Sequence, residues 1–310
     1  MSTVIFEVEF RGRRYAGVGL PTDAPVTLFP VAEDQLRNAV LAGGGTQALL
    51  DSLTSGTDTI TVSADDPEVH FLPPLLPASN NSLVTGFMGT HRSKFPAPPA
   101  PDEEFKAPNW LIKGFGSWLE TNGGPLTVPS TADELLEEPE VGLVFVNDEF
   151  GNPHYAGYTF GNDLNDIGLH LQNPWGWTPY AKLCDTSLTP WLFLGEPPTT
   201  VTGQIIIERD GEVAWKGDFS AGADSIFQRV PDMVDNLFSY AGMRRPGLVN
   251  YLLLGSDKAS WHAGYRIADG DRIIFDIASH GVVLANDVVY AGQAETAASD
   301  GFGVWGAPSA

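Results

Sequence analysis

Two glutamates near the middle of the chain have the residue type and spacing of metal ligands. Glu138 and Glu140 flank Pro139 in "EPE", directly before the apolar run "VGLVFV". In a strand, side chains at i and i+2 project from the same face. Pro139 suits a strand start, because its missing N–H leaves no ladder bond unmade there. The pair therefore offers carboxylate oxygens, the ligands that Mg²⁺ prefers, on one face.

A third carboxylate follows a predicted hairpin. The segment "NDEFGNP", residues 147–153, predicts a turn, and the extended segment after it leads to Asp163. With the turn at the centre, paired residue numbers add to about 300. This register places Asn162 opposite Glu138 and Asp163 opposite Glu137. Cross-strand neighbours have Cβ atoms about 5 Å apart, so we expect Asp163 beside the paired glutamates.

Two interpretations of this acidic group are open from spacing alone. Carboxylates this close raise one another's pKa and destabilise the fold unless a cation lies between them. Mg²⁺ is the expected ion, with Mn²⁺ or Ca²⁺ as alternatives. The other interpretation is a solvated acidic edge, with Asp163 capping a turn or helix in "GNDLND". Acidic surface is abundant in a chain with 39 Asp and Glu residues.

The composition limits the class of protein. Apolar residues make up 43% and aromatic residues 11% of the 310 residues, which indicates a packed globular protein. The net charge of −22 opposes binding to nucleic acid or to an anionic membrane. A single cysteine, Cys184, excludes an intrachain disulfide. No apolar run reaches the length of about 20 residues that spans a bilayer, and the N-terminus lacks a signal-peptide pattern. We expect a cytoplasmic protein.

The pattern of elements predicts two domains and a mostly β fold of the α+β class. Residues 1–72 predict a small N-terminal α/β domain, with two strands at 3–18 and two short helices within 33–53. A proline-rich connection at 73–79 begins the catalytic domain, 73–310. That domain contains many short strand-like runs, and only "DSIFQRVPDMVDNLFSYAG" predicts a substantial helix. Such spacing favours a mixed, mostly β core of sandwich or rolled type.

At these residues the chain resembles the fumarylacetoacetate hydrolase (FAH) family. The metal site of that family is a Glu-x-Glu pair followed, after a hairpin, by an aspartate in a "GYTxxxD" setting. Here these motifs read "EPE", 138–140, and "GYTFGND", 157–163. Further matches are "AKLCD" around Lys182, the hairpin "RDGEVAWKGDF" at 209–219, "FLPPLLP" and "GFMGTHRSK". The resemblance covers about residues 70–290, and it favours the metal site over the acidic edge.

The resemblance implies an FAH-type core that is a mixed β-sandwich or β-roll, a homodimer, and a small 2-oxo or 1,3-dioxo acid chelated by Mg²⁺. The branch that looks nearest includes dehydratases of 2-keto-3-deoxy sugar acids, whose "ENP"-like segment appears here as "QNPWGW", 172–177. The commoner chemistry of the family implies a hydrolase that breaks a C–C bond. Dehydration by a lyase is the alternative, and a metal-binding scaffold without turnover is the third.

The resemblance also implies roles for single residues. His91 corresponds to the lid histidine, a base acting on water. Lys182 corresponds to a lysine that supplies a fixed positive charge to the substrate carboxylate or enolate, although an ordinary surface lysine is the alternative. Ser256 lies where the family binds substrate, in "GSD". Trp177, with Trp175, is a candidate wall of the substrate pocket, and simple packing is its alternative.

Three positions depart from the pattern of the hydrolases. Lys94 stands where they place a glutamate that pairs with the lid histidine. Ile167 replaces an arginine, and Ser256 lies in "GSD" in place of "GTP" or "GTA". The metal ligands are thus retained while the residues that activate water are altered. This combination fits a dehydratase, and it also fits specialised or lost catalysis.

Overall fold

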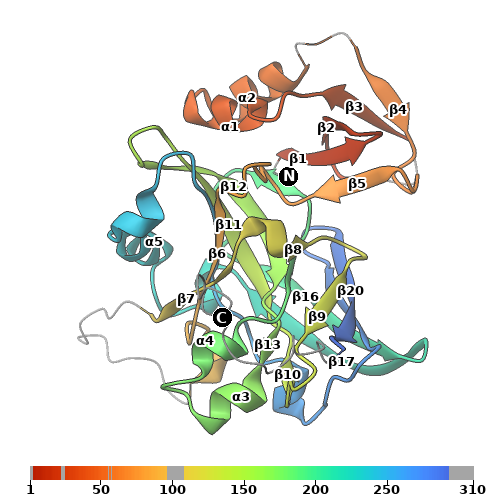
Figure 1. The fold of residues 1–310 in the computed structure, drawn as a ribbon, viewed down its shortest axis with the longest axis vertical. Helices are drawn as coiled ribbons and strands as arrows, with labels where there is room; N and C mark the ends of the chain where they lie inside the picture. The colour runs from red at the N-terminus through yellow and green to blue at the C-terminus, as the bar shows by residue number, and fades with distance from the viewer. Residues whose placement is uncertain (1–2, 22–24, 55, 57, 96–107, 293–310) are drawn as a thin grey trace, which may run out of the picture.

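The computed structural model describes residues 3–21, 25–54, 56, 58–95 and 108–292. These residues form a mostly β fold built around two sheets, with few helices (Figure 1). The expected α+β class with a mostly β core is confirmed.

The larger sheet carries the motifs singled out in the sequence. Its strand order is β4-β3-β2-β1-β15-β12-β11-β18-β6-β7, and β5, β14 and β8 pair at its side. The strands are β1 (Thr3–Phe10), β2 (Arg13–Val18), β3 (Val26–Pro30), β4 (Ile60–Val62), β5 (Val69–Leu72), β6 (Ser82–Phe87), β7 (Trp110–Gly114), β8 (Leu119–Glu120), β11 (Pro139–Asn147), β12 (Pro153–Asn162), β14 (Thr186–Leu188), β15 (Leu192–Leu194) and β18 (Val249–Leu253).

The second sheet has the order β17-β16-β19-β20-β9. Its strands are β9 (Pro125–Val128), β16 (Val201–Arg209), β17 (Glu212–Ala221), β19 (Arg272–Ile277) and β20 (Val282–Tyr290). Strand β16 alternates buried and exposed residues, as a strand does when one face lies on a core. A short pair, β10 (Leu135–Leu136) with β13 (Asn165–Asp166), flanks the acidic residues.

The helices are short and lie outside the sheets. They are α1 (Gln35–Leu41), α2 (Gly45–Thr54), α3 (Ile167–Gln172), α4 (Thr178–Ala181) and α5 (Val230–Phe238), with 3₁₀ turns at Arg92–Lys94, Gly116–Trp118, Ala223–Ser225, Ala241–Arg244 and Ser260–Ala263. The two N-terminal helices and the single larger helix of the second half agree with the sequence pattern. No helix among the described residues is long and apolar enough to cross a bilayer.

The N-terminal strands extend the larger sheet. Strand β1 pairs with β15, with Thr3 opposite Leu194 and Ile5 opposite Leu192. These strands and helices α1 and α2 lie at one end of the molecule, and α3 and α4 lie at the other (Figure 1). The domain boundary after residue 72 stays a prediction.

One hydrophobic core joins the two sheets. Leu143 and Phe160 of the larger sheet and Ile205, Phe275 and Leu284 of the second sheet belong to the same buried cluster. Close packing on both sides leaves little room for the strands to move. Strands β11 and β12, which carry the acidic motif, are therefore a rigid support.

A β-bulge in the hairpin of β11 and β12 sets the register of the acidic motif. Phe145 pairs with Tyr155, but Val144 pairs with Gly157, so one extra residue lies on β12. Gly157 has φ 154°, and a Cβ there would lie 2.4 Å from the carbonyl oxygen of Phe193. Glycine is needed at this position because any side chain would meet the neighbouring strand.

The bulge corrects the expected register by one residue. The expectation of Asn162 opposite Glu138 and Asp163 opposite Glu137 is wrong. Instead, the amide of Asp163 donates a hydrogen bond of 3.0 Å to the carbonyl of Glu138. A shift of one residue moves each side chain to the other face of a sheet. The bulge thereby brings Asp163 to the face of Glu138 and Glu140, as a common site requires.

Candidate metal centre

The structure brings together the three carboxylates predicted to bind a metal ion. Glu138 directly precedes β11, Glu140 is the second residue of β11, and Asp163 directly follows β12. One carboxylate oxygen of each residue lies within 4.8 Å of the other two, and all three residues are buried. Oxygen atoms at such separations can ligate one divalent ion.

Three lysine side chains surround this acidic triad. Lys182 Nζ lies 2.6 Å from Glu138 Oε2 and 3.0 Å from Asp163 Oδ2. Lys94 Nζ lies 2.7 Å from Glu138 Oε1. Lys113 forms a buried ion pair with Asp163. Because each carboxylate oxygen has two lone pairs, Asp163 keeps acceptor sites for a metal ion. Glu138 also accepts from Ser256 and Asn165, so one of its four donors must turn away before it can bind an ion.

Glu140 is the member of the triad that lacks such a partner. The backbone amide of Gly255 donates a hydrogen bond of 2.6 Å to Glu140 Oε2. No basic side chain among the described residues forms an ion pair with Glu140. Burial, together with the carboxylates of Asp163 and Glu138, raises the pKa of Glu140 well above its ordinary value. A buried carboxylate so placed lacks positive charge. The donor set therefore fits a hard divalent cation bound on the side of Glu140.

The electrostatics fix the charge state of Lys182 and Glu138. Burial alone would lower the pKa of Lys182, but the carboxylates of Asp163 and Glu138 outweigh it and raise this pKa. Burial likewise opposes ionisation of Glu138, yet Lys182 and Lys94 hold the pKa of Glu138 below its ordinary value. Both groups are charged at neutral pH, and Lys182 is a fixed positive charge, as its predicted role requires.

Backbone geometry also makes room for the triad. Gly86 of β6 lies against Asp163, and a Cβ at position 86 would lie 2.8 Å from Asp163 Oδ2. Asn165 Nδ2 donates to Glu138 Oε2 at 2.9 Å and to the carbonyl of Asp163 at 3.2 Å. Hydrogen bonds of this kind orient metal ligands.

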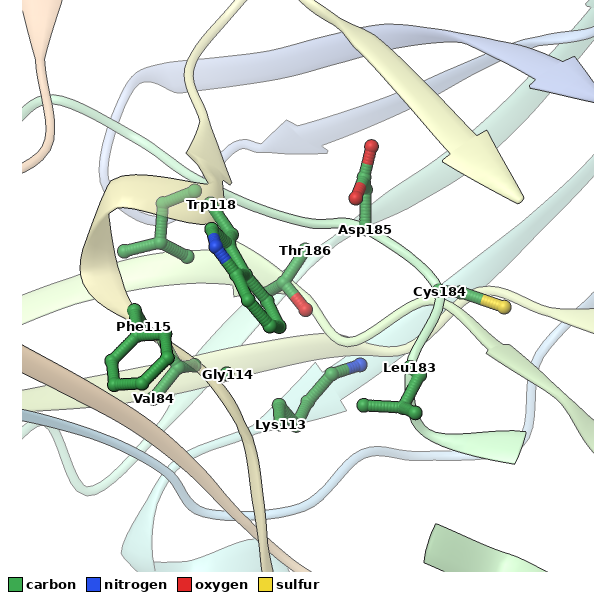
Figure 2. A pocket seen from close by; sticks show the side chains of 10 residues that line it. Val84, Lys113, Gly114, Phe115, Trp118, Leu183, Cys184, Asp185 and Thr186 are labelled. Carbon is green, nitrogen blue, oxygen red and sulfur yellow. The ribbon is translucent and has the colours of Figure 1, made fainter. Parts of the chain in front are cut away.

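A cavity of about 320 Å³ opens beside the triad. This volume is within the usual range for sites that bind small molecules. Polar and charged side chains border it, among them Glu138, Lys182, Lys94, Ser256 and His170. Figure 2 shows a second pocket, around Lys113 and Trp118. Its volume of about 20 Å³ has room for about one water molecule, so it is too small for a substrate.

Of the three residues predicted to bind substrate, Lys182 and Ser256 border the cavity and Trp177 does not. Ser256 borders the cavity, where its Oγ donates to Glu138 Oε1 at 2.8 Å and accepts from Lys94 at 3.0 Å. Trp177 directly precedes α4 and is 40% exposed. It is not among the described residues that line the cavity. Trp175 is 96% exposed. Their roles in substrate binding stay predictions.

His91 lies outside the described lining of the cavity. Its Nε2 lies 3.0 Å from the carbonyl oxygen of Ser220, and its Nδ1 lies 2.8 Å from Ser93 Oγ. A carbonyl only accepts, so Nε2 carries the hydrogen, and the lone pair of Nδ1 accepts from the Ser93 amide at 3.2 Å. Burial lowers the pKa of His91. With both nitrogens engaged, neither is available to a water molecule in this arrangement, and its role as base stays a prediction.

Sequence reasoning missed two of the three basic partners of the triad. The first is Lys113, the one lysine within the apolar run "NWLIKGF". A lysine in such a run indicates a buried ammonium group, and a buried ammonium group needs an anionic partner. Lys94 was noted only as a departure, while its ion pair with Glu138 depends on the tertiary fold. No local signal in the sequence indicates that contact.

Comparisons with known proteins identify the fold. No family model and no curated protein match this sequence. A structure of 2-keto-3-deoxy-D-arabinonate dehydratase complexed with magnesium and 2,5-dioxopentanoate matches with a TM-score of 0.63 and 16% identity, over 93% of this chain and 99% of that one.

Two isomerases have the same architecture. The 5-carboxymethyl-2-hydroxymuconate delta-isomerase from Mycobacterium smegmatis has a TM-score of 0.61 and 18% identity, over 93% of this chain and 100% of that one. The 2-hydroxyhepta-2,4-diene-1,7-dioate isomerase from Mycobacterium marinum has a TM-score of 0.60 and 19% identity, over 94% and 100%. The chain thus has the fold of the FAH family, and the resemblance inferred from its motifs is confirmed at the level of the fold.

Proposed function

We propose that this protein is a Mg²⁺-dependent enzyme that removes water from a small 2-oxo acid of the 2-keto-3-deoxy sugar acid class. The observation that carries the proposal is the buried triad of Glu138, Glu140 and Asp163, with Lys94 bound to it where a hydrolase has its water-activating glutamate. A bound Mg²⁺ supplies Lewis-acid chemistry that withdraws charge from the oxo oxygen of the substrate.

The charge of the site supports an anionic substrate. Three carboxylates and three lysines sum formally to zero, so the site carries two positive charges once a divalent ion is bound. A 2-oxo acid brings one negative charge in its carboxylate. Loss of a proton from the carbon beside the oxo group adds a second negative charge. The site therefore matches the charge of the enolate better than that of the substrate, as catalysis requires.

The three lysines have different roles in binding that anion. Lys182 and Lys94 both border the cavity, so their ammonium groups attract the substrate carboxylate and the developing enolate. Lys113, which is 4% exposed, is bound to Asp163 and to the carbonyl oxygen of Leu164, 2.9 Å from its Nζ. Its position lets it orient the carboxylate of Asp163.

Dehydration has more support than hydrolysis. Hydrolysis of a C–C bond needs an activated water molecule, whereas dehydration releases water. The pair of histidine and glutamate that activates water in the hydrolases is altered here, because Lys94 replaces the glutamate and both nitrogens of His91 are hydrogen-bonded. One protein of the same fold is a dehydratase complexed with magnesium. Hydrolysis remains the alternative that the family resemblance implies.

One assay separates the possible functions. The protein is incubated with a 2-keto-3-deoxy-pentonate and with acylpyruvates, in Mg²⁺ or in EDTA, and products are identified by mass. Loss of water that requires Mg²⁺ supports the proposal. Cleavage into two acids favours the hydrolase. Thermal stabilisation by Mg²⁺ without conversion of any substrate favours a metal-binding scaffold and overturns the proposal.

Two expectations from the sequence accompany this proposal. We propose a homodimer, which the resemblance implies, and a cytoplasmic location. Light scattering of the purified protein measures the mass and so tests the dimer. Fractionation of the host cell tests the location.

A further inference from the structure

His170 borders the same cavity as Glu138 and Lys182. It lies on α3, which begins directly after β13. The cap of this helix is Asp166, whose Oδ1 accepts from the Leu169 amide at 3.0 Å. The ring of His170 is therefore carried by a helix whose capping residue lies three residues after Asp163.

A chain of two hydrogen bonds fixes which nitrogen of His170 carries the proton. Nδ1 lies 2.7 Å from Thr178 Oγ1, and the same hydroxyl lies 2.5 Å from the carbonyl oxygen of Pro174. A carbonyl cannot donate, so the single hydrogen of the hydroxyl points to Pro174. Thr178 Oγ1 can then only accept from His170, and Nδ1 must be the donor. The lone pair of the neutral ring is on Nε2.

The surroundings keep this ring neutral near pH 7. Burial lowers the pKa of His170, and the ammonium of Lys182 adds to this effect, while the carboxylate of Glu138 opposes it. Within the described part of the chain, no group hydrogen-bonds to Nε2. His170 thus has what His91 lacks in this structure, a ring nitrogen with an unused lone pair.

We propose that His170 is the general base of this enzyme and that its Nε2 takes the proton from the carbon beside the oxo group of the substrate. The inference rests on the proposed function, since it needs a 2-oxo acid in the cavity. The C–H bond breaks, its electron pair forms the C=C bond of the enolate, and the carbonyl pair moves to oxygen. The proton forms a new N–H bond at Nε2.

The hydrogen-bond chain suits this role. When Nε2 takes up a proton, Nδ1 still donates to Thr178, so the ring has no need to turn during the reaction. Thr178 is a positioning residue in this scheme, because it acts on substrate only through His170. For β-elimination, the enolate then expels the hydroxyl on the next carbon as water after that hydroxyl gains a proton from solvent.

Exchange of hydrogen for deuterium tests the base directly. The wild-type protein with Mg²⁺ and 2-oxobutanoate in D₂O should exchange the protons at C3, as followed by proton NMR, because the proton on Nε2 is replaced by solvent deuterium. His170→Asn keeps a donor near the position of Nδ1 but removes Nε2. We expect its exchange rate to fall by about 10²-fold or more, while calorimetry finds Mg²⁺ binding unchanged.

Variants of Thr178 separate positioning from folding. Thr178→Val removes the acceptor that fixes the tautomer and should slow exchange and change its pH profile, whereas Thr178→Ser keeps the hydroxyl and should restore both. His154→Asn is the matched control, since His154 pairs with Asp148 beside the hairpin turn and does not border the cavity.

The outcomes distinguish this inference from the proposed function. Exchange by the wild type that is lost in His170→Asn and kept in His154→Asn supports the base. Equal exchange by wild type and His170→Asn overturns the base and leaves the proposed function intact. Absence of exchange in the wild type overturns both.

Discussion

Replacing Glu140 by glutamine should make the protein more stable than wild type without metal and less stable than wild type with bound Mg²⁺. Glu140→Gln keeps the shape of the side chain and removes the one carboxylate of the triad that lacks a basic partner among the described residues. Glu138 and Asp163 repel this carboxylate, and Lys182 attracts it, which leaves about one net like charge.

The size of the effect follows from the geometry. The oxygens lie within 4.8 Å of one another, and at an effective dielectric constant of about 20 one like charge at that distance costs about 3 kcal/mol. Uptake of a proton by Glu140 relieves part of this cost, because its pKa is raised. We expect the metal-free variant to be about 1–3 kcal/mol more stable than wild type, which corresponds to about 2–6 °C in Tm.

Magnesium should invert that order. At a Mg²⁺ concentration of 1,000 times Kd, the wild type gains about 4.1 kcal/mol from binding, while the variant, with one charged ligand fewer, gains little. Thermal unfolding followed by circular dichroism, in EDTA and in a Mg²⁺ series, measures both effects. Glu212→Gln, at the exposed start of β17, is the control and should change neither.

Two results would refute this reasoning. A metal-free Glu140→Gln protein that is less stable than wild type means that the charge of Glu140 is already compensated. Equal stabilisation of both proteins by Mg²⁺ means that Glu140 is not a ligand of the ion.

Three further changes test the surroundings of the triad and one titrating group. Gly86→Ala places a Cβ 2.8 Å from Asp163 Oδ2 and should weaken Mg²⁺ binding, measured by calorimetry, by about 10–100-fold. Lys94→Met removes the cation 2.7 Å from Glu138 Oε1. It should tighten Mg²⁺ binding about tenfold, or about 1.4 kcal/mol, and weaken the binding of 2-oxobutanoate. His280 packs among aromatic rings, and burial lowers its pKa. The imidazole of His280 therefore takes up a proton more readily in the unfolded chain than in the folded protein. The free energy of unfolding should fall as the pH drops below about 6.5. His280→Gln should lose less stability than wild type between about pH 7.5 and pH 5.5 in urea unfolding.

Each of these predictions has a contrary outcome. Unchanged Mg²⁺ affinity in Gly86→Ala would mean that Asp163 can shift without leaving the ion. Weaker Mg²⁺ binding in Lys94→Met would mean that Lys94 supports the ligand set. The same loss of stability with pH in His280→Gln and wild type would assign the acid sensitivity to other groups. His70→Gln, on the exposed part of β5, is the control for that measurement.

The sequence predicted the parts of the site that depend on local spacing. The "EPE" motif implied two glutamates on one face of a strand, and the structure places Glu138 directly before β11 and Glu140 as its second residue. The turn residues between 147 and 153 predicted the hairpin that returns to Asp163. Strand periodicity and turn chemistry are local properties, and they can be deduced from neighbouring residues.

The register of that hairpin could not be predicted by the same means. Counting from the turn gave a pairing that would have put Asp163 on the face opposite the glutamates. The bulge between Val144 and Phe145 changes the face, and it depends on the approach of β15 to Gly157. That approach involves a strand more than thirty residues away, so the local sequence does not contain it.

The lysines that neutralise the triad were also beyond local inference. Lys94 comes from a 3₁₀ turn, Lys113 from β7 and Lys182 from the end of α4. The resemblance to a family singled out Lys182 alone. Lys94 follows strand β6, and Lys113 lies on β7, which pairs with β6. Strand β6 is separated from β11 only by β18, so both lysines come close to the triad.

The distribution of charge would let one site hold both the proposed cation and the proposed anionic substrate. Glu138 and Asp163 are paired with lysines, so the fold contains their charges without a ligand. The unpaired carboxylate of Glu140 would attract a divalent ion. Lys182 and Lys94 border the cavity, where that ion adds to their positive charge. A carboxylate substrate is then attracted only after the metal ion has bound, which predicts that 2-oxobutanoate binds tightly in Mg²⁺ and weakly in EDTA.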